Sequence, residues 1–524
     1  VEWSHSAGKT PESLDSPSSS PTTPSISYRC VPDIWEPGAL DAILTEKSSD
    51  TTCVIHTAGP YADRSPTVLD ACIDWKIPVY VDVSDPLDFL DASKERHGKA
   101  VAAGTTAVLA AGAFPGLSNL LALEAAEGAG ASQLSDDRAE SSPTSTSTKV
   151  RDVRFNYFTK GLGGSGTINL YITNLGFGDP IVAHEQGKRT RFDDLSGRLL
   201  GTVDFFLDDA TVESRSNNDN ADADDNSRWK RENARAKRRV GTQKVFAWPF
   251  PEAATVASSL NIEGSSSSAM GTAPEIWNDM LGLLVDLVPR KWWRSPRFSL
   301  FLADFSEPLV LATDWAMQKW SSVAKTKNEE DSYDGEEPNG ECGETHAMRV
   351  DVVTTTEDFA TSGESSSSMV SIVQCHDSFR RCVGQSCAEF ALDILSDATR
   401  NGGVYLPEDR YRESADRKRI LPRLVSTPGT FCYTGPVPVV PETVTEDVEG
   451  GLEPSDRILL KSTPTPGLLC NGAPIEVRLV AEGDGDEEDG EDRGSESAPN
   501  QRQRLPVYPR EVREIVQSLE SQRL

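Results

Sequence analysis

The chain has 524 residues and a formal net charge of −30. Sequence-independent binding to nucleic acid needs a basic surface that displaces counterions, so this charge argues against nucleic acid as a partner. The length allows two or three domains, and no apolar run reaches the roughly 18 residues that a transmembrane helix needs. Nine cysteines without a framework spacing indicate reduced thiols in an intracellular protein, in the cytoplasm or a plastid. Because the first residue is Val1, we treat the chain as a candidate fragment.

The first folded region is predicted between residues 28 and 130, after a Ser-, Pro- and Thr-rich segment 1–27 in which we expect no fold. Apolar strands alternate there with amphipathic helices. Strands are expected within 51–59, 77–85 and 105–118, and helices within 65–76, 88–104 and 118–128, the first helix with Val68, Leu69, Cys72 and Ile73 on one face. Strands that alternate with helices of this length predict right-handed crossovers and a parallel sheet.

A second, α+β domain is predicted over residues 150–435, after a polar linker 131–149. It begins with a half-buried strand and contains two antiparallel neighbours, within 349–358 and 368–377. A long helix within 378–395 should turn Val383, Cys387, Phe390, Ala391 and Ile394 inward. We expect disordered insertions near 215–239 and 325–344 and a mostly disordered acidic tail over 436–524.

The stretch "HTAGPY", residues 56–61, ends the first expected strand with a tight turn. Gly59 permits a close backbone approach and Pro60 fixes the chain as it leaves the strand. At the carboxyl end of a parallel strand such a turn faces the crevice where ligands bind. The turn is therefore either a ligand contact or a plain tight turn. His56 beside it either packs structurally or titrates near neutrality.

Two further loops are expected at the same edge of the sheet. Asp82 and Asp85 end the second strand, where a carboxylate could orient a ligand or cap the next turn through Asx hydrogen bonds. Gly112, Pro115 and Gly116 form a rigid elbow after the third strand, near the domain interface.

A G-x-G-x-x-G pattern occurs at Gly161, Gly163 and Gly166, after the strand that opens the second domain. Three interpretations stay open: a structural turn, a loop that lines the substrate cleft, and a pyrophosphate site. No second strand ending in an acid follows at the βαβ distance, which counts against pyrophosphate. The cysteines around residues 375–387 lack the paired spacing of a zinc site, so we expect no metal.

Taken together, these motifs resemble the saccharopine dehydrogenase-like family of nicotinamide-dependent oxidoreductases. The resemblance is collinear over roughly residues 28–435 and extends to the broad family, whose substrates include unassigned ones. It is carried by "HTAGPY" (56–61), "DVSD" (82–85), "GAFPGLSN" (112–119), "TKGLGGSGT" (159–167), "GTAPEIWN" (271–278), "GGVYLPED" (402–409) and "STPGTFCY" (426–433).

The resemblance implies a Rossmann-type first domain and hydride transfer between NADP, or NAD, and a small substrate. It places Ala58, Gly59, Pro60, Tyr61, Asp82 and Gly112 toward the cofactor, and Phe114, Pro115, Gly116, Gly163 and Gly164 toward the substrate. The family's dinucleotide fingerprint is absent from residues 1–27, so the first βα unit is missing from this sequence. No catalytic residue is assigned, and Lys160, His56 and Asp82 are candidates by position only.

Two other hypotheses remain. A degenerate Rossmann scaffold without activity would explain the missing fingerprint and the long charged insertions. A membrane-surface protein would use the apolar segment 280–293, which ends in a basic and aromatic cluster with Trp292 and Trp293. The other interpretation of this segment, which we favour, is a buried helix with a capped end. The resemblance also suggests a homodimer through the second domain.

Overall fold

The computed structural model describes residues 31, 33–47, 51–131, 147–161, 166–208, 211–212, 223–273, 275–308, 312, 344–357, 365–397 and 400–439. The chain divides into two compact units, residues 1–42 with 475–524 and residues 43–474. Apart from the start of α1 (Asp41–Lys47), the elements below belong to the second unit. The predictions for 1–27, for most of the linker 131–149, for 325–343 and for the tail beyond residue 439 lie outside the described residues.

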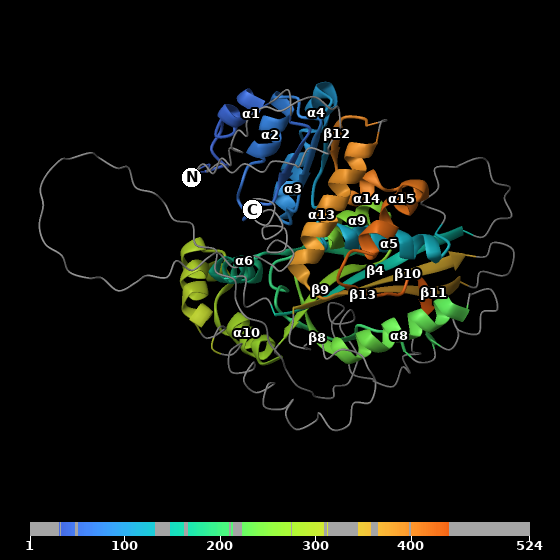
Figure 1. Cartoon of the computed structure of the whole chain (residues 1–524). Coiled ribbons are helices and arrows are strands. Elements are labelled where there is room, and N and C mark those ends of the chain that lie inside the picture. Colours follow the sequence, from blue (N-terminus) through green and yellow to red (C-terminus); the bar gives the residue numbers. More distant parts are fainter. Residues whose placement is uncertain are drawn as a thin grey trace, which may run out of the picture. The chain divides into compact units, whose positions relative to one another are not determined.

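The first sheet has four strands in the order β1-β2-β3-β12, and every neighbouring pair is parallel (Figure 1). Its strands are β1 (Cys53–His56), β2 (Val79–Asp82), β3 (Thr106–Val108) and β12 (Gly403–Tyr405). The predicted parallel sheet and α/β class are confirmed by this topology. The fourth strand was not predicted, because its apolar run is only residues 404–406, between two glycines and a proline, whereas β3 of equal length lies in the longer apolar run 107–111. It comes from the "GGVYLPED" stretch, which the sequence assigned to the second domain.

The helices of this region follow the predicted pattern with one difference. They are α2 (Thr67–Asp74), α3 (Leu87–Lys94), α4 (His97–Ala103) and α5 (Leu117–Gly128). The four predicted inward residues of α2 are buried, which confirms its apolar face. The single helix expected within 88–104 is divided into α3 and α4. Arg96 lies at the junction, where its guanidinium donates to the Ala92 carbonyl oxygen (2.8 Å) and to Asp70 (3.1 Å).

The second sheet is larger and mixed, and the pair β4–β9 is its parallel one. Its order is β13 (Thr430–Tyr433), β11 (Ser365–His376), β10 (Thr345–Glu357), β4 (Ser147–Lys160), β9 (Ser266–Ala273), β8 (Thr242–Ala247) and β7 (Leu199–Asp204), with β14 (Val437–Val439) paired to β11. The antiparallel neighbours predicted from the sequence are β10 and β11, a prediction that the register confirms. Strand β4 begins inside the expected linker, at Ser147. A separate hairpin joins β5 (Ile181–Glu185) and β6 (Lys188–Phe192).

Helices lie on both faces of the second sheet (Figure 1). The face toward the first sheet carries α5, α9 (Glu252–Ser259), α13 (Phe379–Ser396), α14 (Pro407–Arg410) and α15 (Ser414–Val425). The opposite face carries α8 (Ala223–Arg239). Further helices are α6 (Gly166–Gly178), α10 (Glu275–Leu287), α11 (Arg290–Trp293) and a helix over residues 296–308. In the described part of the chain, no helix is long and apolar enough to cross a membrane.

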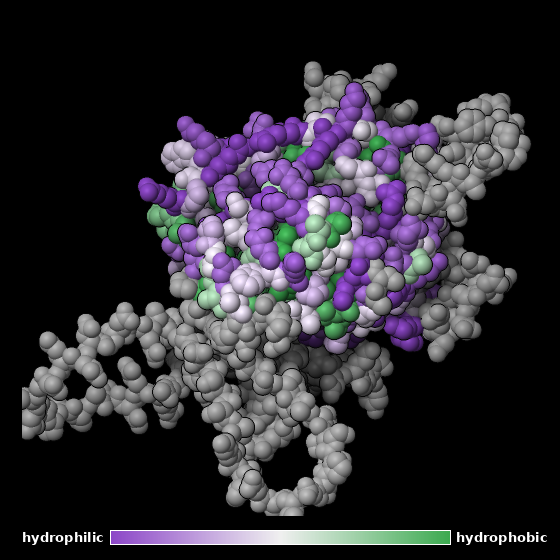
Figure 2. Space-filling model, turned by 90° about the horizontal axis from the view of Figure 1, so that it is seen from above, coloured by the Kyte–Doolittle hydropathy of each residue, from purple (hydrophilic) through white to green (hydrophobic). Residues whose placement is uncertain are grey.

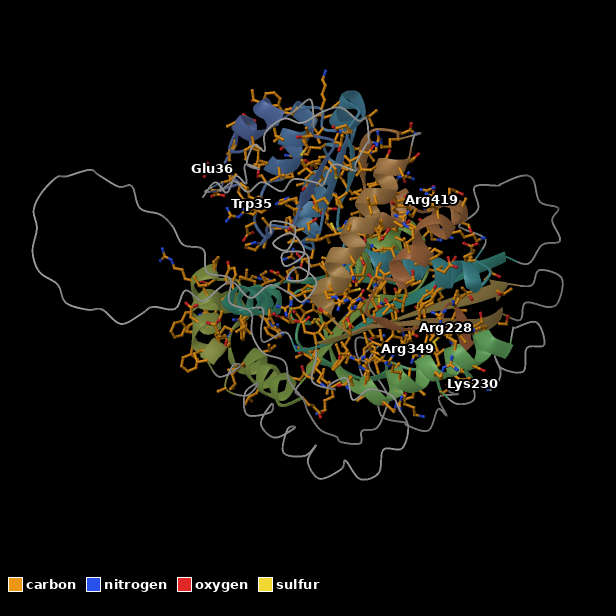
Figure 3. The ribbon with its side chains drawn as sticks, viewed as in Figure 1. Trp35, Glu36, Arg228, Lys230, Arg349 and Arg419 are labelled. Carbon is orange, nitrogen blue, oxygen red and sulfur yellow. The ribbon has the colours of Figure 1, made fainter. Side chains whose placement is uncertain are left out.

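Helix α8 corrects the expectation of a disordered insertion near 215–239, at least for residues 223–239. Charged residues interrupt its apolar pattern in the sequence, and two of them, Arg228 and Lys230, are labelled on the helix in Figure 3. Trp229 and Ala236 lie seven residues apart and are buried against the sheet, where they join Phe158 and Val373. Because seven residues make about two helical turns, both side chains lie on the face of α8 that packs against the sheet.

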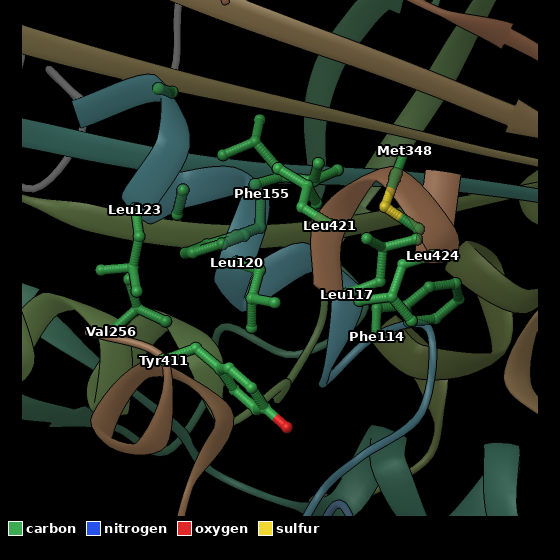
Figure 4. Packing of buried hydrophobic residues seen from close by; sticks show 14 of the residues in the cluster. Phe114, Leu117, Leu120, Leu123, Phe155, Val256, Met348, Tyr411, Leu421 and Leu424 are labelled. Atoms are coloured by element: carbon green, nitrogen blue, oxygen red, sulfur yellow. The ribbon is translucent and has the colours of Figure 1, made fainter. Parts of the chain in front are cut away.

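The main core joins the two sheets. Helix α5 follows β3 of the first sheet and is buried along most of its length against β4 and β10 of the second. Figure 4 shows Leu117 and Leu120 of this helix beside Phe155 of β4 and Leu421 of α15. The predicted inward residues of α13 are buried or packed against the same core. The face seen from above in Figure 2 is mostly hydrophilic, with small hydrophobic areas.

Candidate functional site

The carboxyl ends of β1, β2 and β3 bring three loops to one edge of the first sheet. Of the loop after β1, Thr57, Ala58 and Gly59 are exposed and Pro60 is half-buried. A Cβ added at Gly59 would meet nothing closer than the Tyr61 ring, at 3.7 Å. The turn therefore presents bare backbone to solvent, and packing within the protein does not require glycine there.

Tyr61 holds this turn in place through buried contacts. Its side chain is buried, its hydroxyl donates to the His56 carbonyl oxygen (2.7 Å), and its ring meets Phe89 edge-on at 5.2 Å. Of the predicted cofactor-side residues in this loop, Ala58 and Gly59 are thus open to a ligand. Tyr61 acts on the loop by holding it.

His56 belongs to a buried hydrogen-bond chain under the edge. The Tyr80 hydroxyl donates to Asp82 Oδ2 (3.0 Å), so it accepts from His56 Nδ1, 2.9 Å away. Burial lowers the pKa of His56 to about 4, which leaves the imidazole neutral at physiological pH. The structural interpretation of His56 fits this arrangement, and titration near neutrality does not.

Asp82 is fully buried and fastens the ends of two strands together. Its Oδ1 accepts from the backbone N–H groups of Ser84 (3.1 Å) and Ala110 (2.8 Å) and from the Ser84 hydroxyl (2.6 Å). Burial raises its pKa, while these hydrogen bonds act in the opposite direction. The capping interpretation is the one that its contacts fit, since both oxygens are engaged away from solvent.

Asp85 and Asp179 are acids at this edge that are not fastened in this way. Burial raises the pKa of Asp85 to about 6, and the charge of Asp179 contributes to this shift. Desolvation by neighbouring atoms also raises the pKa of Asp179 to about 6, although this residue is exposed to solvent. Asp85 follows β2 of the first sheet, and Asp179 follows α6, which lies between β4 and β5 in the chain. Sequence reasoning named Asp85 but missed Asp179, because nothing local to α6 shows that its end meets the first sheet.

The elbow after β3 is packed tightly. The Gly112 N–H donates to the Pro115 carbonyl oxygen (3.0 Å), and a Cβ at Gly116 would lie 2.1 Å from the Gly112 carbonyl oxygen. Gly116 has φ +129°, a conformation that favours glycine. Phe114 stacks on Tyr157 at 4.2 Å and an interplanar angle of 16°. These predicted substrate-side residues are buried, and together they join the first sheet to the second.

Buried acids lie beneath the elbow. Asn119 Oδ1 accepts from the Gly116 N–H (2.9 Å), and Asn119 Nδ2 donates to Glu408 Oε2 (2.7 Å). Tyr157 donates to Glu252 Oε1. Burial raises the pKa of Glu252 to about 8, so this carboxyl group carries a proton at neutral pH. Glu252 was missed from the sequence, where an acid in the first turn of a helix normally indicates a surface residue.

The glycine pattern of the second domain is described only in part. Gly163 and Gly164 lie outside the described residues, Gly161 follows β4 with φ +81°, and Gly166 begins α6. Lys160 is the last residue of β4, paired with Thr345 and Ala273. This pattern lies on the second sheet, so no strand of the first sheet feeds it.

The described residues contain no group of three His, Cys, Asp or Glu side chains that could hold a metal ion. Cys375 packs in the cluster beneath the second sheet, whereas Cys382 and Cys387 pack in the core between the sheets.

Among solved structures, the chain is similar to the apo, histidine-tagged saccharopine dehydrogenase (L-Glu forming) from Saccharomyces cerevisiae. The identity is 13%, the match covers 78% of this chain and 88% of the yeast chain, and the TM-score is 0.43. No protein-family model matches this chain, and no curated protein matches it significantly. The fold class stated above rests on the strand order and pairing.

Proposed function

We propose that this protein is an NADP- or NAD-dependent oxidoreductase that transfers hydride to or from a small substrate. The observation that supports it is the edge of the first sheet, where three parallel strands deliver an exposed glycine turn, a loop fixed by Asp82 and a rigid elbow. In open α/β sheets, ligands bind in the crevice outside the carboxyl ends of the strands. The resemblance to the saccharopine dehydrogenase-like family supplies the cofactor class.

The residues of this edge fit the nicotinamide end of the cofactor. The bare backbone of Ala58 and Gly59 can approach a flat ring or ribose closely. Tyr61 and Asp82 position the two loops, and Gly112 holds the start of the elbow. Bound cofactor supplies the hydride chemistry, while the protein supplies position and electrostatics. No glycine fingerprint for the pyrophosphate lies on the first sheet among the described residues.

Asp85 is the best candidate for a proton-transferring group. It is half-buried beside the exposed turn, and its pKa of about 6 lets it exchange a proton near neutral pH. The charge of Asp85 also helps to raise the pKa of the buried Tyr61 hydroxyl. We assign Asp179 to the tuning of this acid, since its charge raises the pKa of Asp85.

Titration of the full chain with NADPH and with NADH, followed by cofactor fluorescence, tests the proposal. We expect micromolar binding of one of them and at least about tenfold weaker binding by Gly59→Val, because the added side chain would occupy the cofactor's place. Gly98→Val is the matched control, because Gly98 is exposed as well and its Cβ would meet no neighbouring atom within 4 Å. Equal affinity in the three proteins would reject the contact at Gly59.

The competing function is a non-catalytic scaffold with the same fold. It is favoured by the engagement of Phe114, Tyr61 and Asp82 in packing and in hydrogen bonds within the protein. A full chain that binds neither NADPH nor NADH at millimolar concentration would replace the oxidoreductase with the scaffold.

A further inference from the structure

The segment that follows α10 is fixed to the protein body along one side. Trp293 of α11 is fully buried, where its ring packs against Phe177 (5.3 Å) and Phe298 (5.8 Å). The next helix, residues 296–308, turns Ser299 and Ala303 inward. The Arg290 and Arg294 side chains donate to the carbonyl oxygens of α6 residues. These buried contacts hold the helix 296–308 in place.

The opposite side of the same helix is exposed and apolar. Leu300, Phe301 and Phe305 lie on one stripe at helical spacing, and their side chains are 47%, 64% and 63% exposed. The rings of Phe301 and Phe305 are stacked on each other at 6.4 Å. Trp292, 51% exposed, contacts Phe298 at 5.5 Å. A helix of a soluble protein normally turns such a stripe to the core, so this cluster indicates an interaction surface.

Basic side chains surround these exposed rings. The sequence "RKWWRSPR", residues 290–297, has four basic residues in eight, within a chain whose net charge is −30. Lys291 and Arg297 are exposed and form no ion pair with any described residue. Asp304 is the acid on the exposed stripe. The surface thus combines unpaired cations with exposed aromatic and aliphatic side chains.

We propose that this aromatic–basic surface, made of Lys291, Trp292, Arg297, Leu300, Phe301 and Phe305, docks on the surface of an anionic lipid bilayer. Aromatic side chains favour the membrane interface, and lysine and arginine are attracted to anionic headgroups. A second copy of the chain is a poorer occupant, because two copies of this surface would place the same unpaired cations opposite each other. The proposal does not depend on the oxidoreductase proposal.

Sedimentation of the full chain with vesicles tests it. We expect the protein to pellet with vesicles of phosphatidylcholine and phosphatidylserine, to remain in the supernatant with phosphatidylcholine alone, and to dissociate as salt is raised. Lys291→Glu with Arg297→Glu should reduce the partition coefficient by more than about 30-fold, because it removes two attractive charges and adds two repelled ones. Phe301→Ser with Phe305→Ser should reduce it more than about tenfold, and Trp292→Ala should weaken it as well.

Leu392→Ser is the matched control, since Leu392 of α13 is also 54% exposed and lies outside the surface. Its partition coefficient should equal that of the unchanged protein. Absence of phosphatidylserine-dependent pelleting overturns the proposal, and so does equal pelleting of the phenylalanine double variant. Light scattering without lipid tests whether a second copy of the chain occupies the surface. If the unchanged protein is a dimer, the phenylalanine double variant is a monomer and vesicles bind neither, then the surface joins two copies and the bilayer is rejected.

Discussion

The turn after β1 and the elbow after β3 have similar sequences and opposite surroundings. Each places a glycine and a proline at the carboxyl end of a strand of the same parallel sheet. The first exposes its backbone, and a Cβ at Gly59 would have room. The second is buried, and a Cβ at Gly116 would collide with Gly112. Glycine therefore leaves the backbone exposed to solvent in one loop and permits close packing in the other.

Substitution of Gly116 should have the largest effect on stability. Gly116→Ala would place a Cβ 2.1 Å from a backbone oxygen at a φ that side chains rarely adopt, so we expect a loss above about 4 kcal/mol or a failure to fold. Gly98→Ala is the control, because it has open space. Urea denaturation followed by circular dichroism measures both. An unchanged midpoint for Gly116→Ala would show that the elbow can relax.

Loss of the elbow's aromatic ring should have the next largest effect. Phe114→Ala removes the ring that stacks on Tyr157 and Phe379, and we expect a loss of about 3–5 kcal/mol. Phe301→Ala, at an exposed position, should change stability by less than about 0.5 kcal/mol. Similar losses from the two variants, measured by urea denaturation, would contradict the assignment of Phe114 as the joint between the sheets.

The acid under the elbow should make stability depend on pH. The pKa of Glu252 is raised to about 8 in the folded protein from a usual 4.5, so the folded state retains the proton longer. The contribution of this carboxyl group to the free energy of unfolding is complete below pH 4.5 and is lost as pH rises through 8. Glu252→Gln cannot ionise, so its stability relative to the unchanged protein should increase between pH 5 and pH 8. Urea midpoints at both pH values check this, with the exposed Glu95→Gln as control. A constant difference would contradict it.

The turn after β1 should show the smallest effect on stability. Gly59→Ala adds a methyl group with no atom closer than 3.7 Å, so the free energy of unfolding should change by less than about 0.5 kcal/mol. Thermal denaturation measures this. A loss comparable with that of Gly116→Ala would show that both loops use glycine for packing, and the contrast between them would disappear.

The sequence predicted those parts of the fold that have a local periodic pattern. The parallel sheet, the buried face of α2 and the hairpin β10–β11 all follow from apolar spacing within single segments. Strand β12 lies in a short apolar run between two glycines and a proline, and in α8 charged residues separate the buried positions.

The candidate site was predicted less completely than the fold. The motifs located the three loops, but which of their residues are buried depends on side chains far away in the sequence. Phe114 stacks on Phe379, and Asn119 bonds Glu408, across separations of 265 and 289 residues. No spacing rule reports such contacts. For this reason Asp179 and Glu252 were missed, and Asp82 was given a ligand role as well as a capping one.

Strand β12 has a consequence for how the chain is made. Residues 403–405 pair with 106–108, so the first sheet lacks this strand until residue 405 has left the ribosome, long after residue 108. Domains usually fold in order from the amino terminus during synthesis, and pairings between distant residues slow folding. Here the amino-terminal strands wait for a late segment, with one side of β3 unpaired. Premature termination before residue 403 should therefore leave an aggregation-prone product in which even the early strands lack a finished sheet.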